Sequence, residues 1–211
     1  QLAKRFLSDK IEHGAISNEG AVEVIEKYLD CSVFDNTNKV CFAACTELPN
    51  YNVKYFRLND YDEETRKKIV LASASLPLIY DSTEVVGEKY IDGGIADNTP
   101  IQPVYGEKCD VIIVVLLSKE ATIDRDLYPH SKLIIIAPEN LDENTINGTL
   151  NLDTDAKRVR INEGYKDTMN RLKPVMELTK FINEKEEEEE NPMLYKMYGK
   201  LKSVSFKRKE K

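Results

Sequence analysis

The chain has 211 residues, of which 41% are hydrophobic and 32% charged, and a formal net charge of −7 at pH 7. These values are typical of one soluble globular domain with an appendage, large enough to bury a core without disulfides or a metal. The negative charge disfavours general nucleic-acid binding, which needs a basic face. No run reaches the roughly 20 apolar residues of a membrane span, and no signal peptide opens the chain. The four cysteines are expected to be reduced thiols, from which we expect a cytoplasmic protein, with peripheral contact to a membrane surface as a further option.

Helices and a strand pair are expected in the first third of the chain. Gln1–Lys10 is typical of the end of a helix, and Ser17 and Asn18 offer capping oxygens to the next one. The apolar positions of that second helix are Val22, Ile25, Tyr28 and Leu29. Val40–Cys45 and Val53–Arg57 are predicted strands with a turn between them.

The middle of the chain predicts a helix followed by strands. Asp62 is expected to cap a helix with acidic residues in its first turn. Glu88–Ile91 is a short predicted strand, with Asp92 at its C-terminal end. Asp110–Leu117 and Lys132–Ala137 are rich in β-branched residues, which is typical of strands buried on both faces of a parallel sheet. Strands that alternate with connectors, with little hairpin patterning, predict an α/β fold.

A long helix and a charged tail are predicted at the C-terminal end. The apolar stripe of the helix comprises Ala156, Val159, Tyr165, Met169 and Leu172. Pro174 is expected to interrupt this helix. Glu184–Glu190 holds six Glu and one Lys, which predicts a solvated or disordered run, and Lys196–Lys211 holds seven Lys or Arg and one Glu. We therefore divide the chain into a domain over residues 1–182 and a charged tail over residues 183–211.

The most informative motif is Asp92-Gly93-Gly94 at the end of a predicted strand. A carboxylate at this point of an α/β sheet faces the crevice where such sheets bind ligands. The two glycines allow a sharp turn and a close backbone approach. Asp92 is therefore a candidate general base for a neighbouring hydroxyl. The alternative is a tight turn that Asp92 merely caps, because Asp-Gly and Gly-Gly are common turn pairs.

The flanking sequence favours the functional interpretation. The run ASASLPLIY…YIDGGIADNTPIQPVYGEKCDVIIVV resembles patatin-like phospholipases of the bacterial type, in the C-terminal part of their domain. The upstream run VCFAACTELPNYNVKYF is similar to a strand pair of that family. Downstream, residues 162–167 (NEGYKD) are similar to a G-Y-x-D helix of the family. Together the resemblance covers roughly Ile11 to Leu172.

This resemblance implies a three-layer α/β/α sandwich with a mainly parallel central sheet. It also implies a serine acyl hydrolase that works with a Ser–Asp dyad. Asp92 matches the catalytic aspartate, which accepts the serine proton, and Gly93 and Gly94 shape its turn. Asn98 matches a family Asn that holds the following loop. The resemblance implies a lipid or acyl-ester substrate, and we expect no cofactor and no metal.

The chain departs from the family pattern in its glycines. None of the nine glycines forms G-x-S-x-G or a G-x-G loop, so the nucleophile elbow and the oxyanion-hole motif are both absent from these residues. In the family both elements precede the matched region, and this chain starts at Gln1 inside an expected helix, so we expect them upstream. Asp97 stands where relatives often carry Asn. It is expected to bond its own turn, and the alternative is that two close carboxyls raise each other's proton affinity.

Other candidate residues are weaker. His13 and His130 are the two histidines, and neither has a triad pattern around it. Cys45 and Cys109 are expected to be packed, reduced thiols rather than nucleophiles. For the basic, aromatic-containing C-terminal segment we favour a solvated tail that pairs with the Glu run, and the alternative is contact with an anionic membrane surface.

The sequence therefore predicts the aspartate half of a patatin-like lipid acyl hydrolase, inactive by itself. The alternative is a non-catalytic module of the same fold that binds lipid or a partner protein.

Overall fold

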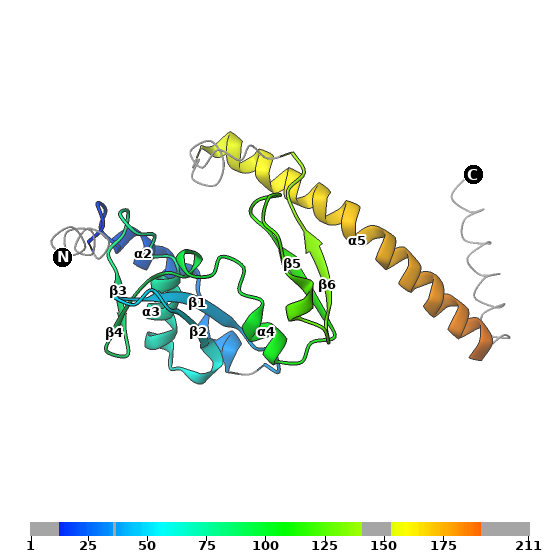
Figure 1. Cartoon of the computed structure of the whole chain (residues 1–211), viewed down its shortest axis with the longest axis horizontal. Coiled ribbons are helices and arrows are strands. Elements are labelled where there is room, and N and C mark those ends of the chain that lie inside the picture. The colour runs from blue at the N-terminus through cyan, green and yellow to red at the C-terminus, as the bar shows by residue number, and fades with distance from the viewer. Residues whose placement is uncertain (1–12, 36, 141–152, 191–211) are drawn as a thin grey trace, which may run out of the picture. The chain divides into compact units, whose positions relative to one another are not determined.

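The computed structural model describes residues 13–35, 37–140 and 153–190. Its chain divides into two compact units (Figure 1). Unit 1 comprises Gln1–Val114 with Asp124–Ile134, and unit 2 comprises Val115–Ile123 with Ile135–Lys211. Each unit is described here by itself.

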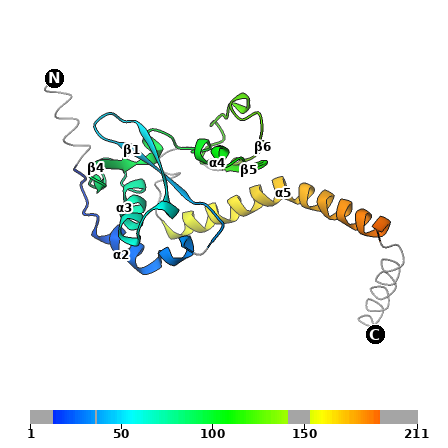
Figure 2. The ribbon, with the colours of Figure 1, turned by 90° about the horizontal axis from the view of Figure 1, so that it is seen from below.

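Unit 1 is built on a four-stranded antiparallel sheet with the strand order β2-β1-β4-β3. The strands are β1 (Phe42–Glu47), β2 (Val53–Arg57), β3 (Thr83–Val85) and β4 (Glu88–Asp92). The helices are α2 (Glu19–Tyr28), α3 (Glu63–Ser73) and α4 (Gln102–Gly106), with short 3-10 turns η1 (Cys31–Phe34), η2 (Leu58–Asp60), η3 (Gly93–Ile95) and η4 (Arg125–Leu127). Helix α3 packs against β1, β3 and β4 and also contacts α2 (Figure 2).

Helix α3 begins where its cap was predicted. The Asp62 carboxylate accepts a hydrogen bond from the Thr65 backbone N–H at 3.0 Å and from the Thr65 hydroxyl at 2.9 Å. Glu63 and Glu64 add negative charge to the first turn, where it interacts favourably with the positive end of the helix dipole. The cap therefore sets the start of the helix that covers the sheet.

The core of unit 1 lies between α3 and the sheet. Its buried members are Cys45, Phe56, Leu58, Ile69, Ala72, Val85 and Tyr90. The ring of Phe56 meets those of Tyr61 and Tyr90 edge to face, with centroids 5.8 and 5.2 Å apart. Such contacts add to the hydrophobic burial, so β2 and β4 are joined through side chains although β1 separates them.

The expected α/β class is confirmed, but the expectation of a mainly parallel sheet is wrong for this sheet. The reason is two hairpins: β1–β2, which was expected as a strand pair, and β3–β4, which was not expected. Strands β3 and β4 are joined by Val86 and Gly87, whose φ values are 51° and 84°. Two residues with positive φ make the kind of tight turn that joins antiparallel strands. Val is rarely found in this region, so the turn had no recognisable signal.

A second sheet contains β5 (Val111–Val115) and β6 (Lys132–Ile136), which run parallel. The prediction that β5 is buried on both faces is wrong. Ile112 and Val114 are buried, whereas Val111, Ile113 and Val115 are more than half exposed. A strand covered on one face alternates in burial in this way because successive side chains point to opposite faces.

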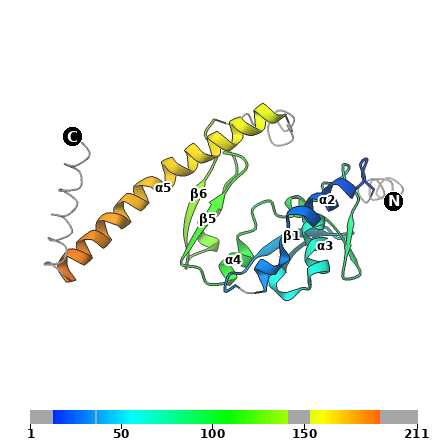
Figure 3. The same cartoon turned by 180° about the vertical axis from the view of Figure 1, so that it is seen from behind.

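Helix α5 (Thr154–Glu190) is continuous, and the predicted interruption at Pro174 is wrong (Figure 3). Proline removes one backbone hydrogen bond and does not always end a helix. Lys173 pairs with Glu177, and Lys180 pairs with Glu184, each at i,i+4 spacing that favours the helix. The acidic run predicted to be solvated or disordered is therefore helical up to Glu190. The basic segment of the predicted tail lies outside the described residues.

Candidate functional site

Asp92 lies at the C-terminal end of β4, as predicted, and caps the 3-10 turn η3. Its Oδ1 accepts a hydrogen bond from the Gly94 backbone N–H at 2.7 Å. The backbone N–H of Asp92 donates to the Ser75 carbonyl at 2.9 Å, and its carbonyl accepts from the Thr46 hydroxyl at 2.8 Å. The backbone that carries the carboxylate is therefore fixed from the end of α3 and from β1.

Each of the two glycines after Asp92 lies at a position where a side chain would meet a different neighbour. A Cβ on Gly93 would lie 2.1 Å from the Ala44 carbonyl oxygen, which is too close for any side chain. A Cβ on Gly94 would lie 2.9 Å from Asn98 Oδ1 and 3.0 Å from Asp92 Oδ1. Gly93 thus lets the turn pass directly over β1, and Gly94 lies between the side chains of Asp92 and Asn98.

Burial raises the pKa of the Asp92 carboxyl above its ordinary value, although the Gly94 N–H lowers it in part. Removal from water disfavours the charged form of an acid. A carboxylate with a raised pKa binds a proton more readily, and general bases work best when their pKa approaches the working pH. The environment of Asp92 therefore favours proton acceptance more than that of a surface aspartate.

The second carboxylate, Asp97, bonds its own turn as predicted. Its Oδ1 accepts from the Thr99 backbone N–H at 2.9 Å, and its Oδ2 accepts a short hydrogen bond from the Tyr55 hydroxyl. Burial and the neighbouring Asp97 raise the pKa of Tyr55. Sequence reasoning missed Tyr55 because it lies on β2, 42 residues before Asp97, and only the pairing of β1 with both β2 and β4 brings the two close.

A groove of about 590 Å³ contains the Asp92 turn. Its walls are mostly apolar and come from the end of α2, η1, β1, η2, α3 and the segment after β4. The lining residues include Leu29, Phe34, Phe42, Ala43, Ala44, Leu58 and Val70, together with Asp92, Gly94, Asp97 and Asn98. A carboxylate beside an apolar groove is the arrangement expected of a site for an apolar ligand with one polar reacting group.

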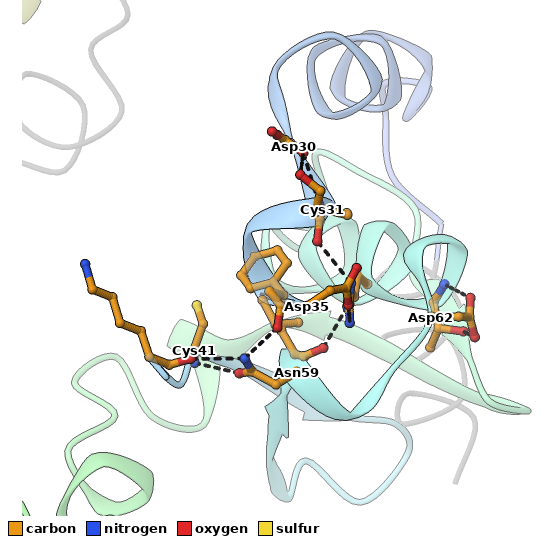
Figure 4. A network of polar contacts seen from close by, with 12 residues as sticks. Asp30, Cys31, Asp35, Cys41, Asn59 and Asp62 are labelled. Carbon is orange, nitrogen blue, oxygen red and sulfur yellow. Dashed lines mark hydrogen bonds and ion pairs between the residues drawn. The ribbon is translucent and has the colours of Figure 1, made fainter. Parts of the chain in front are cut away.

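Two side chains, Asn59 from η2 and Arg66 from α3, fasten one wall of this groove. Figure 4 shows the polar network around Asn59, Cys31 and Asp35. Arg66 donates to the Leu58 carbonyl at 2.9 Å, to the Cys31 carbonyl at 3.0 Å and to the Asp35 carboxylate. Its side chain is only 5% exposed. Nothing in the sequence marks Arg66, which appears as an ordinary surface position of a charged helix, so this wall could not be predicted.

Asn59 also fastens this wall of the groove, through its side-chain amide. Its amide nitrogen donates to the Phe34 and Lys39 carbonyls, both at 3.1 Å, and its Oδ1 accepts from the Cys41 backbone N–H at 3.0 Å. One amide group therefore bridges the end of η1 and the residue just before β1.

The remaining candidates lie elsewhere or are engaged. His13 is close to Asp81, with 3.8 Å between Nδ1 and Oδ1, and neither His13 nor His130 lines the groove. All four cysteines are free thiols. Burial and the charge of Asp92 raise the pKa of Cys45 to about 12, which keeps it a thiol. Ser73 lines the groove, but its hydroxyl donates to the Ala44 carbonyl at 2.8 Å.

The described part of the chain shows neither a metal-binding cluster nor a membrane-spanning helix. Residues 13–35, 37–140 and 153–190 contain no group of three His, Cys, Asp or Glu side chains arranged to hold a metal ion. No helix in the same residues has the length and apolar character needed to cross a bilayer.

The fold and the groove define an α/β protein with a carboxylate at a strand end beside an apolar channel. Residues 1–105 match the model of the patatin-like phospholipase family, and over these residues the chain belongs to that family. The match is in the N-terminal half of the chain and ends just after the Asp92 motif, so the resemblance proposed for residues 106–172 lies outside it. No significant match to a curated protein was found. Membership indicates the lipid acyl hydrolase class in general.

Proposed function

We propose that this chain supplies the general base of a lipid acyl hydrolase, with Asp92 accepting the proton of a catalytic serine that lies outside these 211 residues. The observation that carries the proposal is the Asp92 carboxylate, half-buried beside an apolar groove with a raised pKa. The family of residues 1–105 supports the same assignment.

The proposed reaction has two steps. Asp92 takes the serine proton as the serine oxygen attacks the ester carbonyl, and it returns this proton to the departing alkoxide as the acyl-enzyme forms. Water then attacks the acyl-enzyme while Asp92 takes a water proton, and Asp92 returns that proton to the serine oxygen as the carboxylic acid leaves. Gly93 and Gly94 let the turn present the carboxylate, and Asn98 holds the loop that follows.

We also propose that residues 1–182 form the C-terminal portion of a three-layer patatin-like domain. The exposed apolar face of β5, with Val111, Ile113 and Val115 more than half exposed, supports this, because parallel sheets are normally covered on both faces. The basic segment 196–211 is proposed to contact anionic lipid at a membrane surface.

The second candidate function is a non-catalytic module that binds lipid or a partner protein. Its support is the absence of a G-x-S-x-G motif from the 211 residues. The reading frame upstream distinguishes the two: a strand–turn–helix with this motif supports the enzyme, and its absence contradicts it.

The direct test replaces Asp92 in the full-length protein. Asp92→Asn keeps an oxygen to accept the Gly94 N–H but removes the base, so kcat on a p-nitrophenyl ester should fall roughly 10²- to 10⁴-fold. Asp60→Asn, an exposed aspartate outside the groove, is the matched control and should leave kcat unchanged.

Two outcomes would contradict the proposal. Near-normal turnover by Asp92→Asn would refute the base assignment. Labelling of the 211-residue chain alone by a serine-directed fluorophosphonate would show that a nucleophile, with Ser73 the first to examine, was overlooked.

A further inference from the structure

The groove extends along β1 from the Asp92 turn toward the start of the strand, as the strand register shows. In the sheet, Cys45 on β1 pairs with Asp92, and Gly93 passes over Ala44. The groove then includes Ala44, Ala43 and Phe42, which lead toward the start of β1. Three residues of extended strand from Cys45 back to Phe42 span roughly 10 Å. The Asp92 turn therefore lies beside one end of this stretch of β1.

Phe34 lies at the other end. The Asn59 side chain bonds both the Phe34 carbonyl and the Cys41 backbone N–H, so η1 is fastened next to the residue that precedes β1. Phe34 and Cys41 both line the groove. A ligand that extends from Asp92 along the start of β1 meets this segment.

Arg66 contacts both the Phe34 ring and the turn that carries it. The Arg66 guanidinium carbon lies 5.4 Å from the Phe34 ring centroid, within the range of a cation–π contact. Arg66 also bonds the Cys31 carbonyl and the Asp35 carboxylate, at the two ends of η1. Both ends of the short turn that carries Phe34 are thereby anchored to the same buried guanidinium.

We infer that Phe34 is the chain-length stop of the groove: it limits how far an acyl chain can extend from Asp92 along β1. Arg66 and Asn59 are positioning residues that act through η1. The inference rests on the proposed function for the identity of the ligand, a single unbranched acyl chain. It goes further by assigning acyl-chain selectivity to one side chain and its two attachments.

The experiment compares acyl chains of two lengths in the full-length protein. The readout is kcat/KM for p-nitrophenyl laurate divided by kcat/KM for p-nitrophenyl butyrate. Phe34→Ala opens the far end of the groove and should raise this ratio roughly tenfold. Phe34→Leu should raise it less and serves if the alanine variant does not fold.

Matched controls lie beside the tested residues. Val33 precedes Phe34 in the same turn, is 54% exposed and does not line the groove, so Val33→Ala should leave the ratio unchanged. Asn59→Ala should move the ratio in the same direction as Phe34→Ala, through KM for laurate rather than kcat. Asn52→Ala, an exposed amide in the β1–β2 loop, should not move the ratio.

A binding measurement separates this inference from the proposed function. Binding of cis-parinaric acid, followed by its fluorescence, needs no nucleophile and should be tighter in Phe34→Ala than in the wild type or Val33→Ala. If the wild type binds this acid and Phe34→Ala binds it more tightly while no ester is hydrolysed, the stop is supported and the enzyme is not. If esters are hydrolysed but Phe34→Ala and Phe34→Leu keep the wild-type ratio, the stop is refuted and the enzyme stands. Failure of the wild type to bind the acid would also overturn the inference.

Discussion

The α3–sheet core of unit 1 and helix α5 of unit 2 differ in how far their apolar side chains are buried. In unit 1 the apolar side chains of α3 and the sheet bury one another, and buried polar groups such as Arg66 fasten the loops around them. In unit 2 most of the large apolar residues of α5 stay exposed, including Ile161, Tyr165 and Phe181. The comparison shows that the described part of unit 1 contains a buried apolar cluster between α3 and the sheet, whereas the apolar surface of α5 has no described partner.

The largest effect on stability is expected from Arg66. Arg66→Leu removes the donor to Asp35 and to two backbone carbonyls, and it leaves the two carbonyls without that donor in a buried setting. The Tm should fall by roughly 5 °C or more. Arg171→Leu is the matched change in unit 2, where an exposed arginine donates to one carbonyl of β6, and its Tm should stay within roughly 2 °C of the wild type. Equal effects at both positions, measured by thermal unfolding, would remove the contrast between the units.

The next effect concerns two glycines. Gly93→Ala places a Cβ 2.1 Å from a β1 carbonyl oxygen and should cost about 1–3 kcal/mol of unfolding free energy. Gly164→Ala, in the exposed interior of α5, meets nothing within 4 Å and should stabilise the protein by about 0.5–1 kcal/mol. Denaturant unfolding of both variants measures the two signs, and a stabilising Gly93→Ala would disprove the tight packing of the Asp92 turn.

The smallest effect is a pH dependence at Asp92. Burial raises its folded pKa above the ordinary 3.8, so the folded state binds this proton more tightly than the unfolded state. Its contribution is therefore present below pH 3.8 and is lost as the pH rises through the folded pKa. Asn carries no charge, so Asp92→Asn should be more stable than the wild type at pH 7 and should lose this advantage in acid. A constant difference at every pH would contradict the raised pKa.

Local signals were the part of the fold that the sequence could predict. The Asp62 cap, the strand Val53–Arg57 and the position of Asp92 at a strand end were all confirmed. The turn at Val86-Gly87 was missed because its first residue rarely has positive φ. The β-branched runs predicted parallel strands, and β5 and β6 are parallel. The four-stranded sheet of unit 1 is antiparallel, and no such run marked the direction of its strands.

The amino-acid sequence by itself determined the carboxylate, the two glycines behind it and the family of residues 1–105, because these depend on residue types at fixed short spacings. Only the tertiary structure decided which side chains surround that carboxylate. Tyr55, Asn59 and Arg66 reach their partners through the pairing of β1 with β2 and β4 and the packing of α3 on the sheet. Long-range contacts of this kind leave no periodic or local trace in a sequence. The groove beside Asp92, and the position of Phe34 in its wall, are therefore visible only in the tertiary structure.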